Sequence, residues 1–144
     1  MKIGLLSDAH GNHIGLETCL AFLRERGVER LFFLGDAVGY LPDPRAVTEL
    51  LMSDDVYCLL GNHDAMLLGA LRVRESDADV YRIAQCRKRL AVKVRAWLAT
   101  LLPFHAFSTN RRRVLLVHGT PWDPLQGYAY ADSDLSTFRR LPYD

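Results

Sequence analysis

Val56-Tyr57-Cys58-Leu59-Leu60-Gly61-Asn62-His63-Asp64 combines a short apolar run with four small or polar residues that follow it at once. An apolar run of this length predicts a buried strand. Four such residues in succession after a buried strand are uncommon in an ordinary turn. In α/β proteins ligands bind at the carboxyl ends of the strands. The stretch therefore predicts a strand that leads directly into a functional site.

Two earlier stretches have the same design. Residues 3–6 form an apolar run that ends in Ser7-Asp8-Ala9-His10, and residues 31–34 form a run that ends in Gly35-Asp36. Both runs predict buried strands with carboxylate or imidazole side chains at their ends. Three strands of one design predict that their polar ends meet at one edge of a sheet.

Amphipathic segments separate these predicted strands. From Ile14 to Gly27 apolar residues recur at three- and four-residue spacing, and a second such segment follows Pro44. Both segments predict helices. The alternation of strand and helix predicts an α/β fold with parallel strands. The chain shows no internal repeat or linker, so we expect a single domain over residues 1–144.

The second half of the chain has a different pattern. Residues 77–101 predict one long amphipathic helix or two broken ones. Residues 105–109 and 114–117 predict a β-hairpin with its turn at Asn110, which adds antiparallel pairing to the fold. A short helix is expected from about Asp132.

Composition argues against several classes of function. The formal net charge is +1, which gives no strong signal for nucleic acid or an anionic membrane, and Arg111-Arg112-Arg113 is interpreted as a solvated hairpin tip. No apolar stretch approaches the length of a membrane span, and the N-terminus lacks the pattern of a signal peptide. The 3 cysteines form no Cys-x-x-Cys pair and are interpreted as reduced core or near-core residues of a cytoplasmic protein.

The strand ends deliver a set of side chains that can bind metal ions. These are Asp8, His10, Asp36, Asn62, His63, Asp64 and His118. Carboxylate, imidazole and amide groups suit Mn²⁺, Fe, Co²⁺, Ni²⁺ or Zn²⁺ better than Ca²⁺, and the absence of thiolates argues against a structural zinc site. Asp8-Ala9-His10, Gly35-Asp36 and His118 each have an ordinary explanation when taken alone, as a turn or a satisfied core histidine, whereas residues 61–64 are much less ordinary. Four motifs at successive strand ends favour a metal site.

The chain resembles the calcineurin-like metallophosphoesterase family in four successive motifs. These are Asp8-Ala9-His10, Gly35-Asp36, Gly61-Asn62-His63-Asp64 and Val117-His118-Gly119. Residues 35–40 and 118–121 resemble its small prokaryotic phosphodiesterase branch. Protein Ser/Thr phosphatases and diadenosine tetraphosphatases typically carry an Arg shortly after the Gly-Asp motif. This chain has Val-Gly-Tyr-Leu-Pro at residues 38–42, which favours the phosphodiesterase branch.

The resemblance implies a metal-binding role for five residues. Asp8 and His10 would hold one divalent ion, Asn62 and His118 would hold a second, and Asp36 would bridge the two. The implied cofactors are two transition-metal ions, Mn²⁺ first and Fe, Co, Ni or Zn as alternatives. Paired metals of this kind lie roughly 3.5–4 Å apart.

The resemblance also implies the chemistry. A hydroxide between the two ions would attack phosphorus in a small phosphate ester or nucleotide, most readily a phosphodiester. Asn62 and His63 would bind the phosphate, and His63 would protonate the leaving oxygen. Asp64 would orient the His63 ring and raise its pKa, as carboxylate partners of imidazoles do.

Some parts of the family pattern are expected but do not occur. The family ends with a Gly-His-x-His motif, and no such motif follows His118, so we expect a chain truncated before the last metal-ligand motif. The family fold is a β-sandwich flanked by helices, and its second sheet is expected to be incomplete here. An uncovered apolar sheet face would favour self-association, so a homo-oligomer is a further expectation.

Two alternatives stay open at this point. One is a nucleotidase or phosphomonoesterase with the same site, and the other is a non-catalytic metal-binding scaffold protein. Residues 67–75 and 121–131 are the candidate walls of a substrate pocket. Within them, Trp122, Tyr128 and Tyr130 would either stack on a base or pack beneath the loop.

Overall fold

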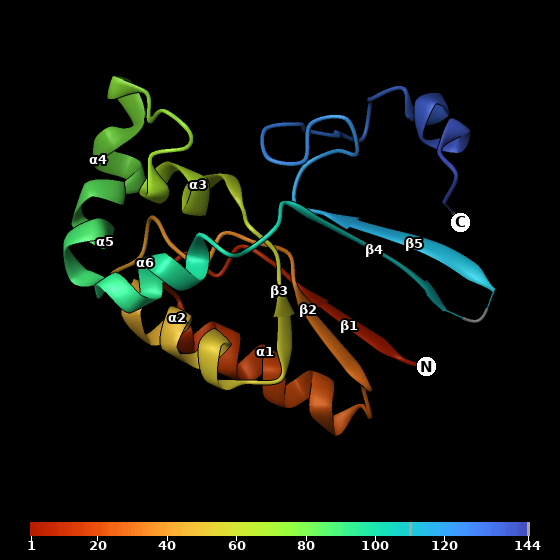
Figure 1. Cartoon of the computed structure of the whole chain (residues 1–144), viewed down its shortest axis with the longest axis horizontal. Coiled ribbons are helices and arrows are strands. Elements are labelled where there is room, and N and C mark those ends of the chain that lie inside the picture. The colour runs from red at the N-terminus through yellow and green to blue at the C-terminus, as the bar shows by residue number, and fades with distance from the viewer. Residues whose placement is uncertain (110, 144) are drawn as a thin grey trace.

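A computed structural model describes residues 1–109 and 111–143 (Figure 1). Its main sheet has three parallel strands in the order β1 (Ile3–Leu6), β2 (Arg30–Phe33) and β3 (Val56–Cys58). Leu6 is level with Phe33 in β2, which is level with Cys58 in β3. The three strands therefore end side by side, as the sequence predicts.

The two predicted crossover helices are present. Helix α1 (His13–Glu25) begins after Asn12, whose side chain accepts a hydrogen bond from the Gly15 N–H at 3.0 Å. Helix α2 (Pro44–Ser53) begins after Asp43, which caps it in the same way. Such caps satisfy N–H groups that lack a partner within the helix, so the local sequence fixes both starting points.

The segment after β3 contains more helices than the sequence predicts. Residues 62–68 form α3 (Asn62–Leu68), which the sequence analysis did not predict. A 3₁₀ turn, η1 (Glu75–Asp77), follows it. The segment over 77–101 is expected to be one long helix or two broken ones, and it is broken further, into α4 (Ala78–Tyr81), α5 (Ile83–Arg89) and α6 (Val92–Leu98).

The breaks between these helices have no glycine or proline to announce them. Arg82, between α4 and α5, has a left-handed backbone with φ of 56°, and Leu90, after α5, is extended. The apolar spacing nevertheless continues across the breaks, because Ile83, Leu90 and Val94 all face the same core. Periodicity alone therefore predicts the buried face but not the breaks.

The predicted hairpin is confirmed, although its turn residue Asn110 lies outside the described residues. Strands β4 (Phe104–Thr109) and β5 (Arg112–Val117) are antiparallel. The short helix expected from about Asp132 is a 3₁₀ helix, η2 (Leu135–Arg140).

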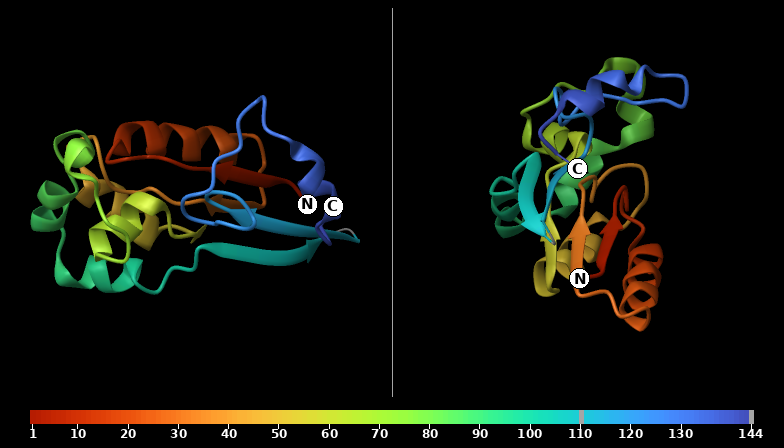
Figure 2. Two further views of the ribbon diagram at one scale, coloured as in Figure 1. Left: turned by 90° about the horizontal axis from the view of Figure 1, so that it is seen from above. Right: turned by 90° about the vertical axis from the view of Figure 1, so that its right-hand side faces the viewer.

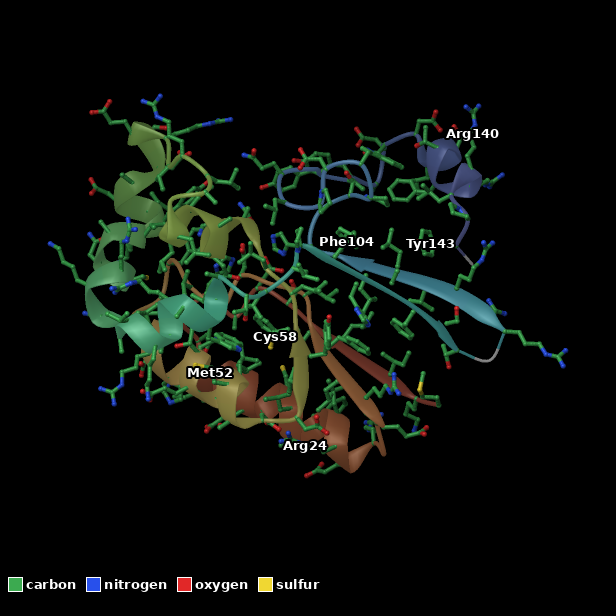
Figure 3. The ribbon with its side chains drawn as sticks, in the orientation of Figure 1. Arg24, Met52, Cys58, Phe104, Arg140 and Tyr143 are labelled. Carbon is green, nitrogen blue, oxygen red and sulfur yellow. The ribbon has the colours of Figure 1, made fainter. Side chains whose placement is uncertain are left out.

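Helices and hairpin cover opposite faces of the parallel sheet (Figures 1 and 2). On the helix side Leu31 and Phe33 belong to the larger core, and Cys58 packs against it (Figure 3). On the hairpin side Phe32 stacks on Phe107 with ring centroids 5.3 Å apart. Leu5 on that side is 51% exposed, so the hairpin covers part of the face. The fold is mixed α/β with a small second sheet.

Two further expectations can be compared with the structure. Cys86 is buried and Cys58 half-buried, but Cys19 is exposed, so its predicted place in or near the core is wrong. Among the described residues, no helix combines the length and the apolar character that crossing a lipid bilayer requires.

Candidate metal centre

Four strand ends bring the predicted ligands together. Ligand atoms of Asp8, Asp36 and His118 lie within 4.8 Å of one another, and so do ligand atoms of His10, Asp36 and His63. Asp36 belongs to both groups. The structure thus places a carboxylate between two sets of possible ligands, as expected for a bridging residue.

The two oxygens of Asp36 have different surroundings. Oδ1 accepts a hydrogen bond from the backbone N–H of His63 at 2.8 Å. Oδ2 lies 3.6 Å from Nε2 of His10 and 3.6 Å from Nε2 of His118. Two ligand atoms that each lie about 2.1 Å from one metal ion are roughly 3–3.5 Å apart. Oδ2 is therefore placed close to where a shared ligand atom would be.

Backbone carbonyls fix the tautomers of both imidazoles. Nδ1 of His10 lies 2.9 Å from the Val38 carbonyl, and Nδ1 of His118 lies 3.0 Å from the Leu34 carbonyl. A carbonyl can only accept, so each Nδ1 carries the proton and donates. Each Nε2 is then left with its lone pair and lies 3.6 Å from Oδ2 of Asp36. A free Nε2 opposite a hydrogen-bonded Nδ1 is the arrangement found in metal-binding histidines.

Asn62 and His118 make a contact that calls for a positive charge. Oδ1 of Asn62 lies 2.8 Å from Nε2 of His118. Nδ1 of His118 already holds the proton. When the His118 ring is neutral, its Nε2 is therefore an acceptor, and Oδ1 of Asn62 is an acceptor as well. A proton or a cation beside them removes the repulsion, and the pair therefore fits a metal ion.

Electrostatics also favour a cation at this site. Asp36 is only 2% exposed, and its burial, together with the charge of Asp64, raises the pKa of Asp36 to about 8. Without a cation the site thus disfavours the ionised carboxylate. A divalent ion beside Oδ2 would reverse that preference, since an opposite charge nearby stabilises the carboxylate. The residues fit the two metal ions that the motifs imply.

The ligand segments have an unusual backbone. Asp8, His10, Asp36 and Tyr40 have φ values of 59°, 47°, 64° and 49°, in the left-handed region that residues other than glycine rarely adopt. Such conformations persist where the surrounding structure holds them, and they concentrate at functional sites.

His63 is enclosed by aromatic rings. Tyr81 and Tyr40 lie with ring centroids 4.4 Å and 4.9 Å from it, and His10 makes an edge contact at 4.8 Å. Its Nδ1 is buried and has no hydrogen-bond partner among residues 1–109 and 111–143, and a Cβ added to Gly39 would lie 2.5 Å from that atom. Glycine at position 39 is thus required for the ring to fit.

Asp64 does not hold the His63 ring. Its two oxygens accept four hydrogen bonds from the backbone N–H groups of residues 36–38 and Gly61, at 2.8 to 3.2 Å. The expected pairing with His63 is therefore wrong. So is the raised pKa: burial, then His10 and His118, lower the pKa of His63 to about 4. Asp64 instead ties together the two loops that carry Asp36 and Asn62.

The two predicted pocket walls meet beside the metal site. A cavity of about 360 Å³ is bordered by Asn62, Arg72, Arg74, Tyr81, Tyr128 and Tyr130, among others. Trp122 is not among its lining residues and packs on Phe138 with centroids 4.7 Å apart. The two segments and the tyrosines at 128 and 130 were expected from the sequence to border a pocket, but the arginines and Tyr81 were not. The side chains that border a cavity depend on tertiary packing, which sequence spacing does not reveal.

Known proteins resemble this chain in sequence and in fold. An uncharacterized protein of Methanocaldococcus jannaschii is 37% identical over 67 residues, which are 46% of this chain and 28% of that protein. A metallophosphoesterase structure from Sphaerobacter thermophilus has a TM-score of 0.67 at 31% identity, over 90% of this chain and 51% of that one. A hypothetical protein of Pyrococcus horikoshii OT3 shares the fold, with a TM-score of 0.76 at 22% identity, over 94% of this chain and 62% of that one.

The chain thus spans 28% of the curated relative that it matches and 62% of the Pyrococcus horikoshii protein. A model of the family described as calcineurin-like phosphoesterases matches residues 1–140, which include all four strand-end motifs. With the match extending over nearly the whole chain, the resemblance noted from the motifs is confirmed, and the chain belongs to the calcineurin-like phosphoesterase family.

Proposed function

We propose that this chain carries the metal centre of a phosphoesterase that hydrolyses phosphodiesters with two divalent transition-metal ions. One observation supports the proposal most strongly. Oδ2 of Asp36 lies 3.6 Å from Nε2 of both His10 and His118, and carbonyls hold both rings in the tautomer that leaves Nε2 free. A buried carboxylate between two such nitrogens has the geometry of a bridging ligand.

The proposed ligands divide into two sets. Asp8, His10 and Asp36 would hold one ion, because Nε2 of His10 lies 3.5 Å from Asp8 Oδ1 and 3.6 Å from Asp36 Oδ2. Asp36, Asn62 and His118 would hold the other. The oxygen and nitrogen donors favour Mn²⁺, with Fe, Co²⁺, Ni²⁺ and Zn²⁺ as alternatives. When bound, two such ions supply Lewis-acid stabilisation of the phosphate charge and a water molecule of lowered pKa.

His63 is the proposed general acid. Its low pKa keeps the ring neutral at pH 7 in the free site, because burial disfavours the charged form. An anionic phosphate beside the ring opposes that effect and favours protonation. Nδ1 is enclosed against Gly39, so we assign the transferred proton to Nε2. The proton would pass to the leaving oxygen as its bond to phosphorus breaks.

The proposal is tested by metal titration and hydrolysis with Asp36→Asn. We expect the unmodified chain to bind Mn²⁺ in calorimetry and to hydrolyse bis(p-nitrophenyl) phosphate in a Mn²⁺-dependent way. Asn at position 36 keeps the shape but loses the charge, so both binding and hydrolysis should fail. Unchanged hydrolysis in the variant would refute the bridging role. Faster hydrolysis of p-nitrophenyl phosphate than of the diester would instead favour a phosphomonoesterase.

Cysteine usage supports a cytoplasmic location. The described part of the chain contains free cysteines at positions 19, 58 and 86, and burial raises the pKa of Cys58 to about 12, which suppresses its reactivity. We place the protein in the cytoplasm on this basis, where free thiols persist.

A further inference from the structure

The cavity beside Asn62 has the size of a small-molecule site. Its volume is about 360 Å³, and such sites typically measure roughly 300–1,000 Å³. It borders Asn62, which is a proposed ligand of the second metal ion. A group bound in the cavity would therefore lie next to the phosphate that is being hydrolysed.

Two arginines give the cavity positive charge. Arg72 and Arg74 both line it, and within residues 1–109 and 111–143 neither guanidinium group has a hydrogen bond or an ion pair. Asp77 also lines the cavity, and its carboxylate accepts a hydrogen bond from the Ser76 hydroxyl. Two guanidinium groups against one carboxylate leave a net positive site, and guanidinium groups pair with phosphate through parallel hydrogen bonds.

Two tyrosines give the same cavity a flat aromatic border. Tyr128 and Tyr130 lie nearly parallel, with an interplanar angle of 10° and ring centroids 5.9 Å apart. Their exposed fractions are 69% and 65%, so much of each ring is uncovered. Exposed aromatic rings of this kind provide stacking surfaces for nucleobases.

Tyr81 connects the cavity with the proposed general acid. It lines the cavity, and its ring centroid lies 4.4 Å from that of His63. The cavity therefore adjoins a side chain that packs directly on the proposed proton donor. The ligand that it accommodates is on this ground the leaving group of the substrate, rather than a separate effector.

We infer that this cavity binds a nucleotide as the leaving group of the phosphodiester, with the base on Tyr128 and Tyr130 and a second phosphate on Arg72 and Arg74. The inference rests on the proposed function. In the dinucleotide pApA, water would add to the internucleotide phosphorus and the bond from phosphorus to O3′ would break. O3′ would take its proton from His63. The products are two adenosine 5′-phosphates, of which the first leaves from the cavity.

Binding to the metal-free full chain tests the ligand class without any hydrolysis. Calorimetry should give a Kd for adenosine 5′-phosphate about tenfold lower than those for ribose 5-phosphate, which lacks the ring, and adenosine, which lacks the charge. Arg72→Ala with Arg74→Ala should raise the Kd for adenosine 5′-phosphate about tenfold and leave the Kd for adenosine unchanged. Tyr128→Ala should raise the Kd for both ligands, and Tyr128→Phe, which keeps the aromatic ring, should bind both as the unmodified chain does.

A charge-matched control is available on other faces. Arg30→Ala with Lys93→Ala removes two exposed positive charges that do not line the cavity, and should leave the Kd unchanged. Equal weakening in this control would reduce the effect to net charge and overturn the inference. Ribose 5-phosphate binding as tightly as adenosine 5′-phosphate, or no binding of the nucleotide, would also overturn it.

Hydrolysis with Mn²⁺ tests the leaving-group role. We expect kcat/KM for pApA to exceed that for ApA, which lacks the 5′-phosphate, about tenfold. The paired arginine variant should remove this difference while hydrolysing bis(p-nitrophenyl) phosphate normally. Equal loss on all three substrates would refute a subsite. If the unmodified chain hydrolyses none of them, the leaving-group role falls with the proposed function, and calorimetry still decides whether the cavity binds a nucleotide.

Discussion

The parallel sheet with its helices and the hairpin with its following loop contribute unequally to the metal site. The first region supplies five of the proposed site residues from three strand ends, and Asp64 ties two of those ends together through the backbone. The second region supplies His118, at the end of one hairpin strand. Its attachments include the Phe32–Phe107 stack and the hydrogen bond from His118 to Leu34.

The difference teaches that the two proposed metal positions differ in robustness. The set of Asp8, His10 and Asp36 lies within one packed region. The set with His118 depends on two regions staying docked. A change in the hairpin should therefore lower the affinity for one ion and leave the affinity for the other unchanged, and titration can measure this asymmetry.

The largest expected effect is that of His63→Ala, which tests whether the first region supplies chemistry beyond metal ligands. We expect kcat for ApA, whose leaving oxygen O3′ is a poor alkoxide leaving group, to fall on the order of 10²–10⁴-fold, because that oxygen loses its proton donor. Mn²⁺ binding by calorimetry should be retained. Since a nitrogen of His63 lies within 4.8 Å of ligand atoms of His10 and Asp36, a parallel loss of metal would reassign it as a ligand.

A matched pair of ligand variants compares the two regions directly. His10→Ala and His118→Ala should each lower the affinity for one Mn²⁺ ion. The loss should exceed the roughly 10–100-fold that follows when only the hydrogen-bond partner of a metal ligand is removed. The ion that remains in His118→Ala should bind more tightly than the one that remains in His10→Ala. Equal residual affinities in calorimetry would show that both positions are equally preorganised.

Loosening the hairpin should affect stability and the second ion together. Leu116 is 6% exposed and packs with Phe32 and Leu59. Leu116→Ala should lower the free energy of unfolding by about 2–3 kcal/mol. Mn²⁺ titration should show a lower affinity for the ion held by His118 and an unchanged affinity for the other ion. Leu102→Ala, at a side chain that is 57% exposed, is the control. Equal weakening of both ions would mean that the regions act as one.

The last expected effect is a pH dependence of the thermal stability of the metal-free protein. Burial raises the pKa of Asp36 to about 8 from an ordinary value of 3.8. The folded state thus binds the proton more tightly than the unfolded state, so this contribution to stability is complete below pH 3.8 and is lost as the pH rises to about 8. Tm without metal should fall over that range, and Asp36→Asn should flatten the slope. Added Mn²⁺ should reverse it.

The sequence predicts the parts of this site that follow from local pattern. Each apolar run with a polar end became a strand that delivers its residues to one edge, because burial of its side chains favours the strand and the crossover helices keep the three strands parallel. The backbone N–H groups that donate hydrogen bonds to Asp64 could not be predicted in this way. Its hydrogen bonds reach residues 36–38, which approach it through tertiary packing.

Other features also lie beyond local pattern. The breaks at Arg82 and Leu90 carry no local signal, and the contact of Tyr81 with His63 joins residues that are 18 positions apart. Helix α3 was missed because its first turn is also its functional motif, Asn62-His63-Asp64, and polar residues there mask the apolar spacing of a seven-residue helix.

The left-handed backbone of Asp8, His10, Asp36 and Tyr40 has a consequence for attempts to make this protein more thermostable. A residue with a side chain in that conformation costs about 1 kcal/mol or more relative to glycine. A search that ranked substitutions by folding stability alone would therefore favour glycine at these positions. Those replacements would remove Asp8, His10 and Asp36. Thermostabilisation should accordingly leave residues 8–10 and 36–40 fixed and seek its gains on the outer helices.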